Sequence, residues 1–164
     1  MNEQLILNLS PNYAPASGIA SSLDKKSFVF STGFEPQVLL ENTLGITKQI
    51  INYTKLYITT RILNGNDLLT LFVATDAAKR MGFRDIEAII PFIPCARQDR
   101  VMQEGEGFSL KVVADLINLQ GYSAVTMYDP HSDVAPALIN NSFVVSNEEH
   151  VRAVINPTYQ NVLG

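Results

Sequence analysis

Four short apolar runs in the first third of the chain are bounded by turn-forming residues, which predicts β-strands. They are rich in aliphatic, β-branched and aromatic residues, as strand positions usually are. The runs cover residues 5–9, 27–31, 37–41 and 55–62.

From residue 66 onward the pattern alternates between helix and strand. Apolar residues recur at helical spacing from residue 66, with Asn66 expected as the N-cap and Gly82 as the terminating residue. Ser109 is the expected N-cap of a second helix that Gly121 would end. Apolar strands are predicted at 86–93, 124–128 and 143–146, and further helices at 132–140 and 147–155.

This rhythm predicts an α/β fold with a mostly parallel sheet and helices on both faces. Parallel strands joined by one helix point the same way, so the segments that follow them emerge at one edge of the sheet. Ligands of open α/β sheets bind at that edge. We therefore expect "CARQDR" (95–100) and "DPHSD" (129–133) to face one crevice.

Composition narrows the class of protein. The chain has 164 residues, of which 46% are hydrophobic and 17% charged, a globular balance. The net charge of -4 and the isoelectric point near 5.1 argue against nucleic-acid binding. The sequence contains neither a membrane-spanning run nor a signal peptide pattern, so we expect a cytoplasmic protein.

Arg97, Gln98, Asp99 and Arg100 follow the strand at 86–93 directly. Arginine suits phosphate, and glutamine can pair with a purine edge or a ribose hydroxyl. By composition alone the segment could equally be a solvated charged turn.

Asp129, His131 and Asp133 alternate, so in an extended segment they would project to one side. Oxygen ligands suit Mg²⁺, and His131 could bind phosphate or act as a general acid or base. Alternatively, Asp129 simply ends a strand and Asp133 caps the next helix. Phosphate-binding arginines beside such a cluster suggest a nucleotide and metal site, although the chain contains no P-loop and no G-x-G-x-x-G.

Five segments together resemble the N-terminal half of the ribose-phosphate diphosphokinases, also called phosphoribosyl diphosphate synthetases. They are "NDLL", "DAAKR", "PF-x-x-CARQDR", "KVVADL" and "DPHSD", at 66–69, 76–80, 91–100, 111–116 and 129–133. The resemblance implies a type I phosphoribosyltransferase-like domain. It also implies transfer of a diphosphoryl group from Mg-ATP to the anomeric hydroxyl of ribose 5-phosphate, with release of AMP.

The resemblance also implies roles for single residues. Arg97, Gln98 and Asp99 would bind ATP, Asp129 and His131 would hold Mg²⁺, and His131 would be catalytic. A family loop that reaches a neighbouring subunit's ATP site is matched loosely by "FSTGFE". Its matching residues are Phe30, Gly33 and Glu35. A homo-oligomer with ATP sites at subunit interfaces is therefore expected.

The departures from the family pattern concern the segments around these motifs. "VMQEGEGFSLK" (101–111) replaces an arginine-rich segment, and "VAPAL" (134–138) replaces Q-G-F-F. The family's lysine loop and its ribose-phosphate loop have no match here. We therefore expect residues 1–150 to be the ATP-binding domain and residues 151–164 to begin a connection to a C-terminal domain.

Two further hypotheses compete with the enzyme. A non-catalytic regulatory or assembly subunit would share the fold without the activity. A metal-dependent phosphohydrolase would use Asp129, His131 and Asp133.

Overall fold

The computed structural model of the chain describes residues 5–10, 27–31, 36–40 and 55–148. Its seven strands are β1 (Leu5–Asn8), β2 (Ser27–Ser31), β3 (Pro36–Leu40), β4 (Lys55–Thr59), β5 (Asp85–Ile89), β6 (Ala124–Tyr128) and β7 (Ser142–Val145) within those ranges. Its three helices there are α1 (Gly65–Arg80), α2 (Ser109–Asn118) and α3 (Val134–Leu138). None of the helices in these ranges is long and apolar enough to cross a membrane.

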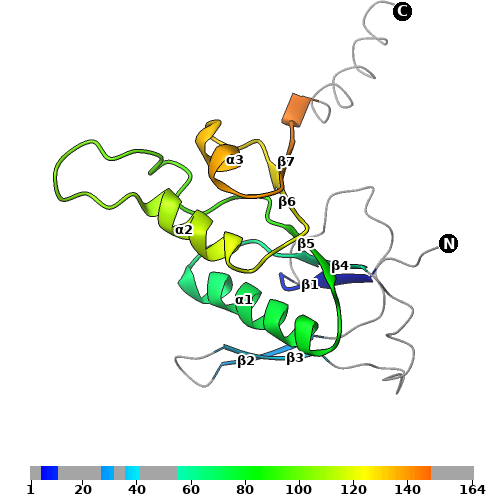
Figure 1. The fold of residues 1–164 in the computed structure, drawn as a ribbon. Coiled ribbons are helices and arrows are strands. Elements are labelled where there is room, and N and C mark those ends of the chain that lie inside the picture. The colour runs from blue at the N-terminus through cyan, green and yellow to red at the C-terminus, as the bar shows by residue number, and fades with distance from the viewer. Residues whose placement is uncertain (1–4, 11–26, 32–35, 41–54, 149–164) are drawn as a thin grey trace, which may run out of the picture.

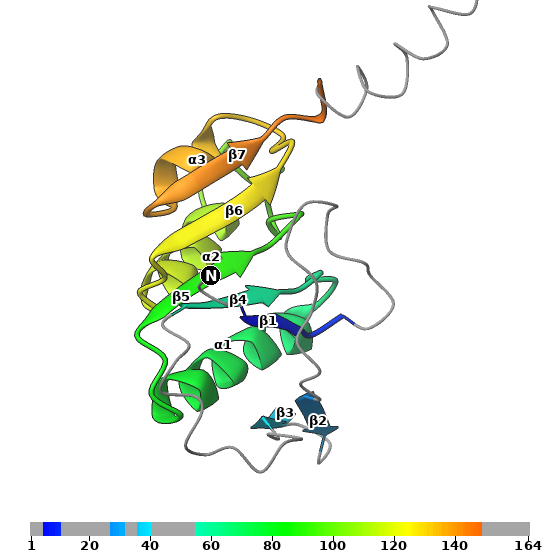
Figure 2. The same cartoon turned by 90° about the vertical axis from the view of Figure 1, so that its right-hand side faces the viewer.

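Five of the strands form one sheet in the order β1-β4-β5-β6-β7, and every neighbouring pair is parallel. This confirms the α/β class. From β4 to β7 the spatial order follows the chain order, so right-handed crossovers place all three described helices on one face (Figures 1 and 2). A helix was also predicted at 147–155, of which the structure describes only the first two residues.

The core lies between this sheet and the helices. Each central strand turns alternate residues toward α1 and α2, as the two-residue period of a strand requires. The buried cluster includes Leu56, Ile58, Ile86, Ala88, Val125 and Met127 from the strands and Leu71, Ala74, Leu110 and Ile117 from the helices. The packed core holds the carboxyl ends of β5 and β6 in fixed relative positions.

The N-terminus of α1 differs from the sequence prediction. Asn64, not Asn66, is the N-cap, because its side chain accepts the backbone N–H groups of Asn66 and Asp67. The Asp67 carboxylate in turn accepts the N–H of Asn64, which completes a capping box. At the other end, Gly82 takes a φ of +100° just after the helix, as a terminating glycine does.

The N-cap of α2 was also predicted wrongly. Phe108 occupies that position and Ser109 is the first helical residue, with no side-chain hydrogen bond at the cap. The amide of Leu110 is satisfied instead by the carbonyl of Gln98, 3.3 Å away in the preceding loop. A hydrogen bond from a distant part of the chain thus takes the place of the side-chain cap that was expected from Ser109.

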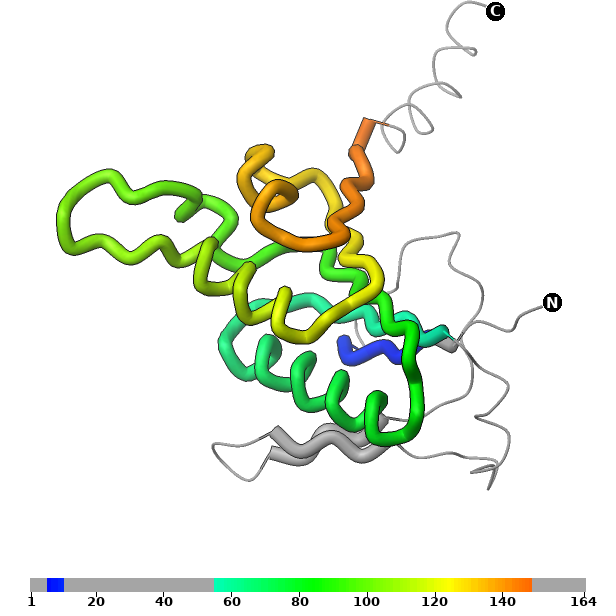
Figure 3. The backbone as a smooth tube through the Cα atoms, in the orientation of Figure 1, coloured from blue at the N-terminus to red at the C-terminus, as the bar shows by residue number. Residues whose placement is uncertain are grey.

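The strand predicted at 86–93 is shorter in the structure. β5 ends at Ile89, and the chain turns after Pro91, which has no N–H to donate to the sheet. Phe92 beyond this point is 56% exposed, whereas Ile93 returns to the core. The early end of β5 leaves a long loop, residues 90–108, between the strand and α2 (Figure 3).

The strands β2 and β3 form a separate antiparallel pair, with Phe30 opposite Gln37. This pair packs on α1, on the side of the helix that faces away from the parallel sheet (Figure 2). The predicted strands at 27–31 and 37–41 are thus confirmed, but in an accessory layer.

Candidate nucleotide-binding site

Two loops leave the sheet at the same edge, one after β5 and one after β6. Each contains a non-glycine residue with left-handed backbone, Cys95 with φ of 62° and Asp129 with φ of 43°. Such conformations are uncommon for residues with side chains and often occur where a loop is shaped for function. Cys95 and Asp129 are the first residues of the two polar segments.

A first cavity of about 370 Å³, the strand-end cavity, lies between the two loops. Phe92 and Ile93 line it from the β5 side, and Tyr128 and Asp129 from the β6 side. Its wall therefore combines aromatic and apolar side chains with polar groups, among them the Asp129 carboxylate.

A second cavity of about 520 Å³, the loop cavity, adjoins the first. It is lined by Arg97, Gln98, Asp99, Arg100, Met102 and Glu106 from the long loop, together with Gly107 and His131. Arg97 and His131 line both cavities, so they stand at the junction. This confirms the expectation that the two polar segments face one crevice.

The positive charges of this crevice differ in their surroundings. The side chain of Arg97 is exposed and forms no ion pair with any described residue. Arg100 is engaged, because its Nε donates to Oδ1 of Asp99 over 3.0 Å. The guanidinium of Arg97 is therefore available to a ligand.

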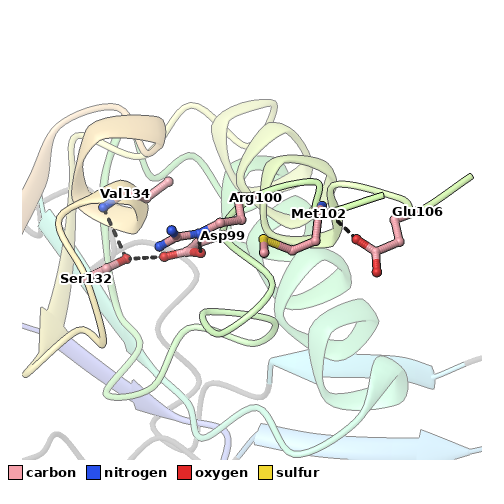
Figure 4. Close-up of polar contacts among 6 residues, drawn as sticks. All are labelled: Asp99, Arg100, Met102, Glu106, Ser132 and Val134. Carbon is pink, nitrogen blue, oxygen red and sulfur yellow. Dashed lines mark hydrogen bonds and ion pairs between the residues drawn. The ribbon is translucent and has the colours of Figure 1, made fainter. Parts of the chain in front are cut away.

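Asp99 was expected to bind ATP, and the structure surrounds it with protein groups. It is 8% exposed, and its second oxygen, Oδ2, accepts a hydrogen bond from the Ser132 hydroxyl at 2.9 Å (Figure 4). The Arg100 guanidinium and then the Ser132 hydroxyl lower the pKa of Asp99, so the carboxylate is ionised at neutral pH. Both of its oxygens thus have protein partners.

The outer part of the loop cavity is a turn closed by Glu106. Its carboxylate accepts the backbone N–H groups of Met102 at 2.8 Å and Gln103 at 3.3 Å (Figure 4). The Gln103 side-chain amide adds a third hydrogen bond. The Met102 N–H lowers the pKa of Glu106. This segment, which has no arginine between residues 101 and 111, thus presents a carboxylate that organises its own loop.

The family model for the N-terminal domain of ribose phosphate pyrophosphokinase matches residues 40–121, half of the chain. The chain belongs to this family. The matched residues include α1, β5 and the arginine-bearing loop, and stop before the DPHSD segment.

Curated relatives support the assignment. The chain is 40% identical over 75 residues to a ribose-phosphate pyrophosphokinase of Mycoplasma pneumoniae, covering 46% of this chain and 23% of that protein. It is 36% identical over 74 residues to ribose-phosphate pyrophosphokinase 2 of Archaeoglobus fulgidus, covering 44% and 26% respectively. The matches thus span about a quarter of the relatives' length.

A solved structure shares the fold. The crystal structure of phosphoribosylpyrophosphate synthetase from Mycobacterium smegmatis superposes with a TM-score of 0.65 at 21% identity. The match covers 86% of this chain and 46% of that one.

In this member of the ribose phosphate pyrophosphokinase family, the predicted metal ligands Asp129 and His131 are both exposed beside the crevice. No group of three His, Cys, Asp or Glu residues gathers into a metal site within the described ranges. Mg²⁺ commonly binds through one or two carboxylates, waters and substrate phosphates. The donor set therefore fits a magnesium ion that arrives with a phosphate ligand, and offers little to a phosphohydrolase that needs three protein ligands.

Of the three residues matched to the family loop, the structure describes the position of Phe30 only. Phe30 is in β2 of the accessory pair, across α1 from the sheet that carries the crevice (Figure 2). Gly33 and Glu35 lie outside the described residues. The structure therefore places β2, which contains Phe30, away from the sheet edge that carries Arg97.

Two polar residues of the site were not anticipated. Ser132 bonds Asp99, and its Oγ also accepts the N–H of Val134, although at a long 3.4 Å. Asn147 donates to Oδ2 of Asp129 over 2.7 Å. A serine two residues before a helix is a sequence signal for the bond to the amide of Val134, but not for the bond to Asp99. The Asn147–Asp129 bond depends on β7 lying beside β6, and no local pattern predicts it. Asp133 occupies the N-cap position of α3 but makes no side-chain cap bond.

Proposed function

We propose that this chain is the ATP-binding part of a ribose-phosphate diphosphokinase. A diphosphoryl group would pass from Mg-ATP to the anomeric hydroxyl of ribose 5-phosphate or a related ribose phosphate. The anomeric oxygen attacks the β-phosphorus, and AMP leaves. The observation that carries the proposal is the position of Arg97 and His131 on the shared wall of two adjoining cavities.

Each residue has a role that suits its surroundings. The guanidinium of Arg97, which has no ion pair among the described residues, supplies donors for phosphate oxygens, and the exposed amide of Gln98 contacts the nucleoside. The imidazole of His131 faces both cavities and binds a phosphate oxygen or transfers a proton there. Asp129 and His131 would hold a magnesium ion, which would supply charge neutralisation for the phosphates. This suits diphosphoryl transfer, which depends mainly on positioning and electrostatics.

The sugar phosphate and the assembly belong to the same proposal. The acceptor would be held by a second domain, for which residues 151–164 begin the connection. Copies of the chain would assemble with ATP sites at their interfaces. The separation of the β2–β3 pair from the chain's own crevice supports this, because β2, which contains Phe30, does not lie beside that crevice.

Calorimetry with Mg-ATP and the purified protein in its native assembly tests the proposal. Arg97→Ala should weaken binding by about 1.5 kcal/mol or more, the low end for a charge-assisted contact. Arg84→Ala is the matched control, since Arg84 is an exposed arginine just before β5, at the opposite ends of the strands. Absence of ATP binding would favour the regulatory subunit, and equal affinities of the two variants would overturn the role of Arg97.

A further inference from the structure

Asp99 is a buried carboxylate in a loop whose neighbouring residues Gln98 and Arg100 are exposed. A buried charge is costly unless it is paired, so the partners of Asp99 decide where this part of the loop can lie. Those partners are Arg100 at 3.0 Å and Ser132 at 2.9 Å. We call the second contact the Asp99–Ser132 bridge.

The two partners of Asp99 differ in their distance along the chain. Arg100 is the next residue in the chain and its side chain is 69% exposed, so this pair fixes nothing beyond the loop itself. Ser132 lies 33 residues away, in the loop after β6. The bridge therefore ties the two loops of the crevice together, as Figure 4 shows between the segments that bear Asp99 and Ser132.

The Asp99–Ser132 bridge lies close in sequence to the two residues at the junction of the cavities. Asp99 is two residues from Arg97, and Ser132 is adjacent to His131. Behind the bridge, the carbonyl of Gln98 is held by the amide of Leu110 at the start of α2. Arg97 and His131 thus stand on two loop segments that are joined, close to both residues, by this side-chain hydrogen bond.

We infer that Ser132 is a positioning residue, which acts through Asp99 to hold Arg97 at the distance from His131 that a phosphate chain needs. This inference rests on the proposed function for its ligand. Ser132 itself need not touch the nucleotide, because its hydroxyl is engaged with Asp99 and with the amide of Val134.

The test compares two serine variants that each lose a bond to an aspartate. Ser132→Ala removes the bridge. Ser123→Ala removes the hydrogen bond from Ser123 to Asp85, at the amino ends of the strands and far from the crevice. Calorimetry should show Mg-ATP affinity reduced about fivefold to tenfold in the first variant and unchanged in the second. Ser132→Thr, which keeps the hydroxyl, should bind nearly as the native protein does.

A double variant separates positioning from general loosening of the fold. If Ser132 acts through Arg97, then Ser132→Ala should have little further effect in an Arg97→Ala background. An equal loss in both backgrounds would overturn the inference, as would equal affinities for the Ser132→Ala and Ser123→Ala variants.

Hydrogen exchange distinguishes failure of the bridge from failure of the proposed function. Ser132→Ala should speed amide exchange in residues 97–100, whether or not the native protein binds Mg-ATP. Faster exchange in a protein that binds no nucleotide would reject the ATP ligand and keep the bridge. Unchanged exchange would reject the bridge itself.

Discussion

The side-chain amide of Asn147 donates a 2.7 Å hydrogen bond to Oδ2 of Asp129, joining the segment after β7 to the loop after β6. The backbone N–H of Asp129 also donates to the carbonyl of Val145, at the end of β7. Asp129 is exposed and has a left-handed backbone, yet it is held at two points. A proposed metal ligand is thus oriented by the neighbouring strand.

Asn147→Ala should raise the Mg²⁺ concentration that ATP binding requires, because the Asp129 carboxylate loses the group that orients it. Groups that hydrogen-bond to a metal ligand and orient it typically contribute about tenfold or more to metal affinity. At an exposed site such as this, the expected loss is about tenfold or less. Calorimetric ATP titrations at a series of Mg²⁺ concentrations provide the measurement. Asn140→Ala is the control, because that exposed asparagine bonds through its backbone amide. A magnesium dependence equal to that of the control would contradict the role of Asn147.

The contribution of Asp99 to stability should depend on pH. Its pKa in the folded protein is lowered, first by Arg100 and then by Ser132, so ionised Asp99 favours the folded state. That contribution is fully present above the unfolded value of about 3.9 and is lost as the pH falls through the lower folded value. Urea unfolding should show a stability gap between the native protein and Asp99→Asn that is constant from pH 7 to 5. The gap should narrow below about pH 4. A stability gap that widened as the pH fell would show that the pKa of Asp99 is not lowered in the folded protein.

Glu106→Ala should loosen the turn at 102–106, because the amides of Met102 and Gln103 lose their acceptor. The exposed backbone should then be cut faster by trypsin after Arg100, which limited proteolysis with mass spectrometry would detect. Glu104→Ala is a matched control, since Glu104 is an equally exposed glutamate in the same loop. If both variants are cut at the same rate, the carboxylate of Glu106 does not organise the turn.

The cap of α1 can be tested with two asparagines that are two residues apart. Asn64→Ala should lower the free energy of unfolding by about 1 kcal/mol, the usual effect of removing an N-cap side chain. Asn66→Ala should change it by less than about 0.5 kcal/mol, because Asn66 contributes its backbone N–H to the cap. Thermal or urea unfolding measures both. A larger loss for Asn66 would restore the cap position that the sequence alone suggested.

These cap positions show what local sequence can and cannot decide. The apolar spacing placed α1 within two residues of its observed start, because helical period is a property of neighbouring residues. The apolar spacing could not choose between Asn64 and Asn66, since both precede the apolar stripe. The signal that distinguishes them is the capping-box spacing, because only Asn64 lies three residues before Asp67. For α2, the amide of Leu110 bonds the Gln98 carbonyl, a partner twelve residues earlier that no helix signal contains.

The crevice followed from the alternation of strand and helix, because parallel strands with single-helix crossovers must present their carboxyl ends together. Arg97 and His131 could therefore be assigned to one site from the chain alone. The β2–β3 pair shows the limit of that reasoning, because the apolar pattern of these strands predicts strands but does not say that the pair packs on α1.

The sequence by itself determined the parallel α/β layout, the edge at which polar residues gather, and the chemical types present there. Only the tertiary structure decided which of those residues remain available to a ligand. Asp99 is occupied by Ser132 and Arg100, whereas Arg97 has no ion pair in the part of the chain that the structure describes. The reason is physical: periodicity reports contacts between residues a few positions apart, but the pairing of a charge depends on groups that folding brings from distant segments.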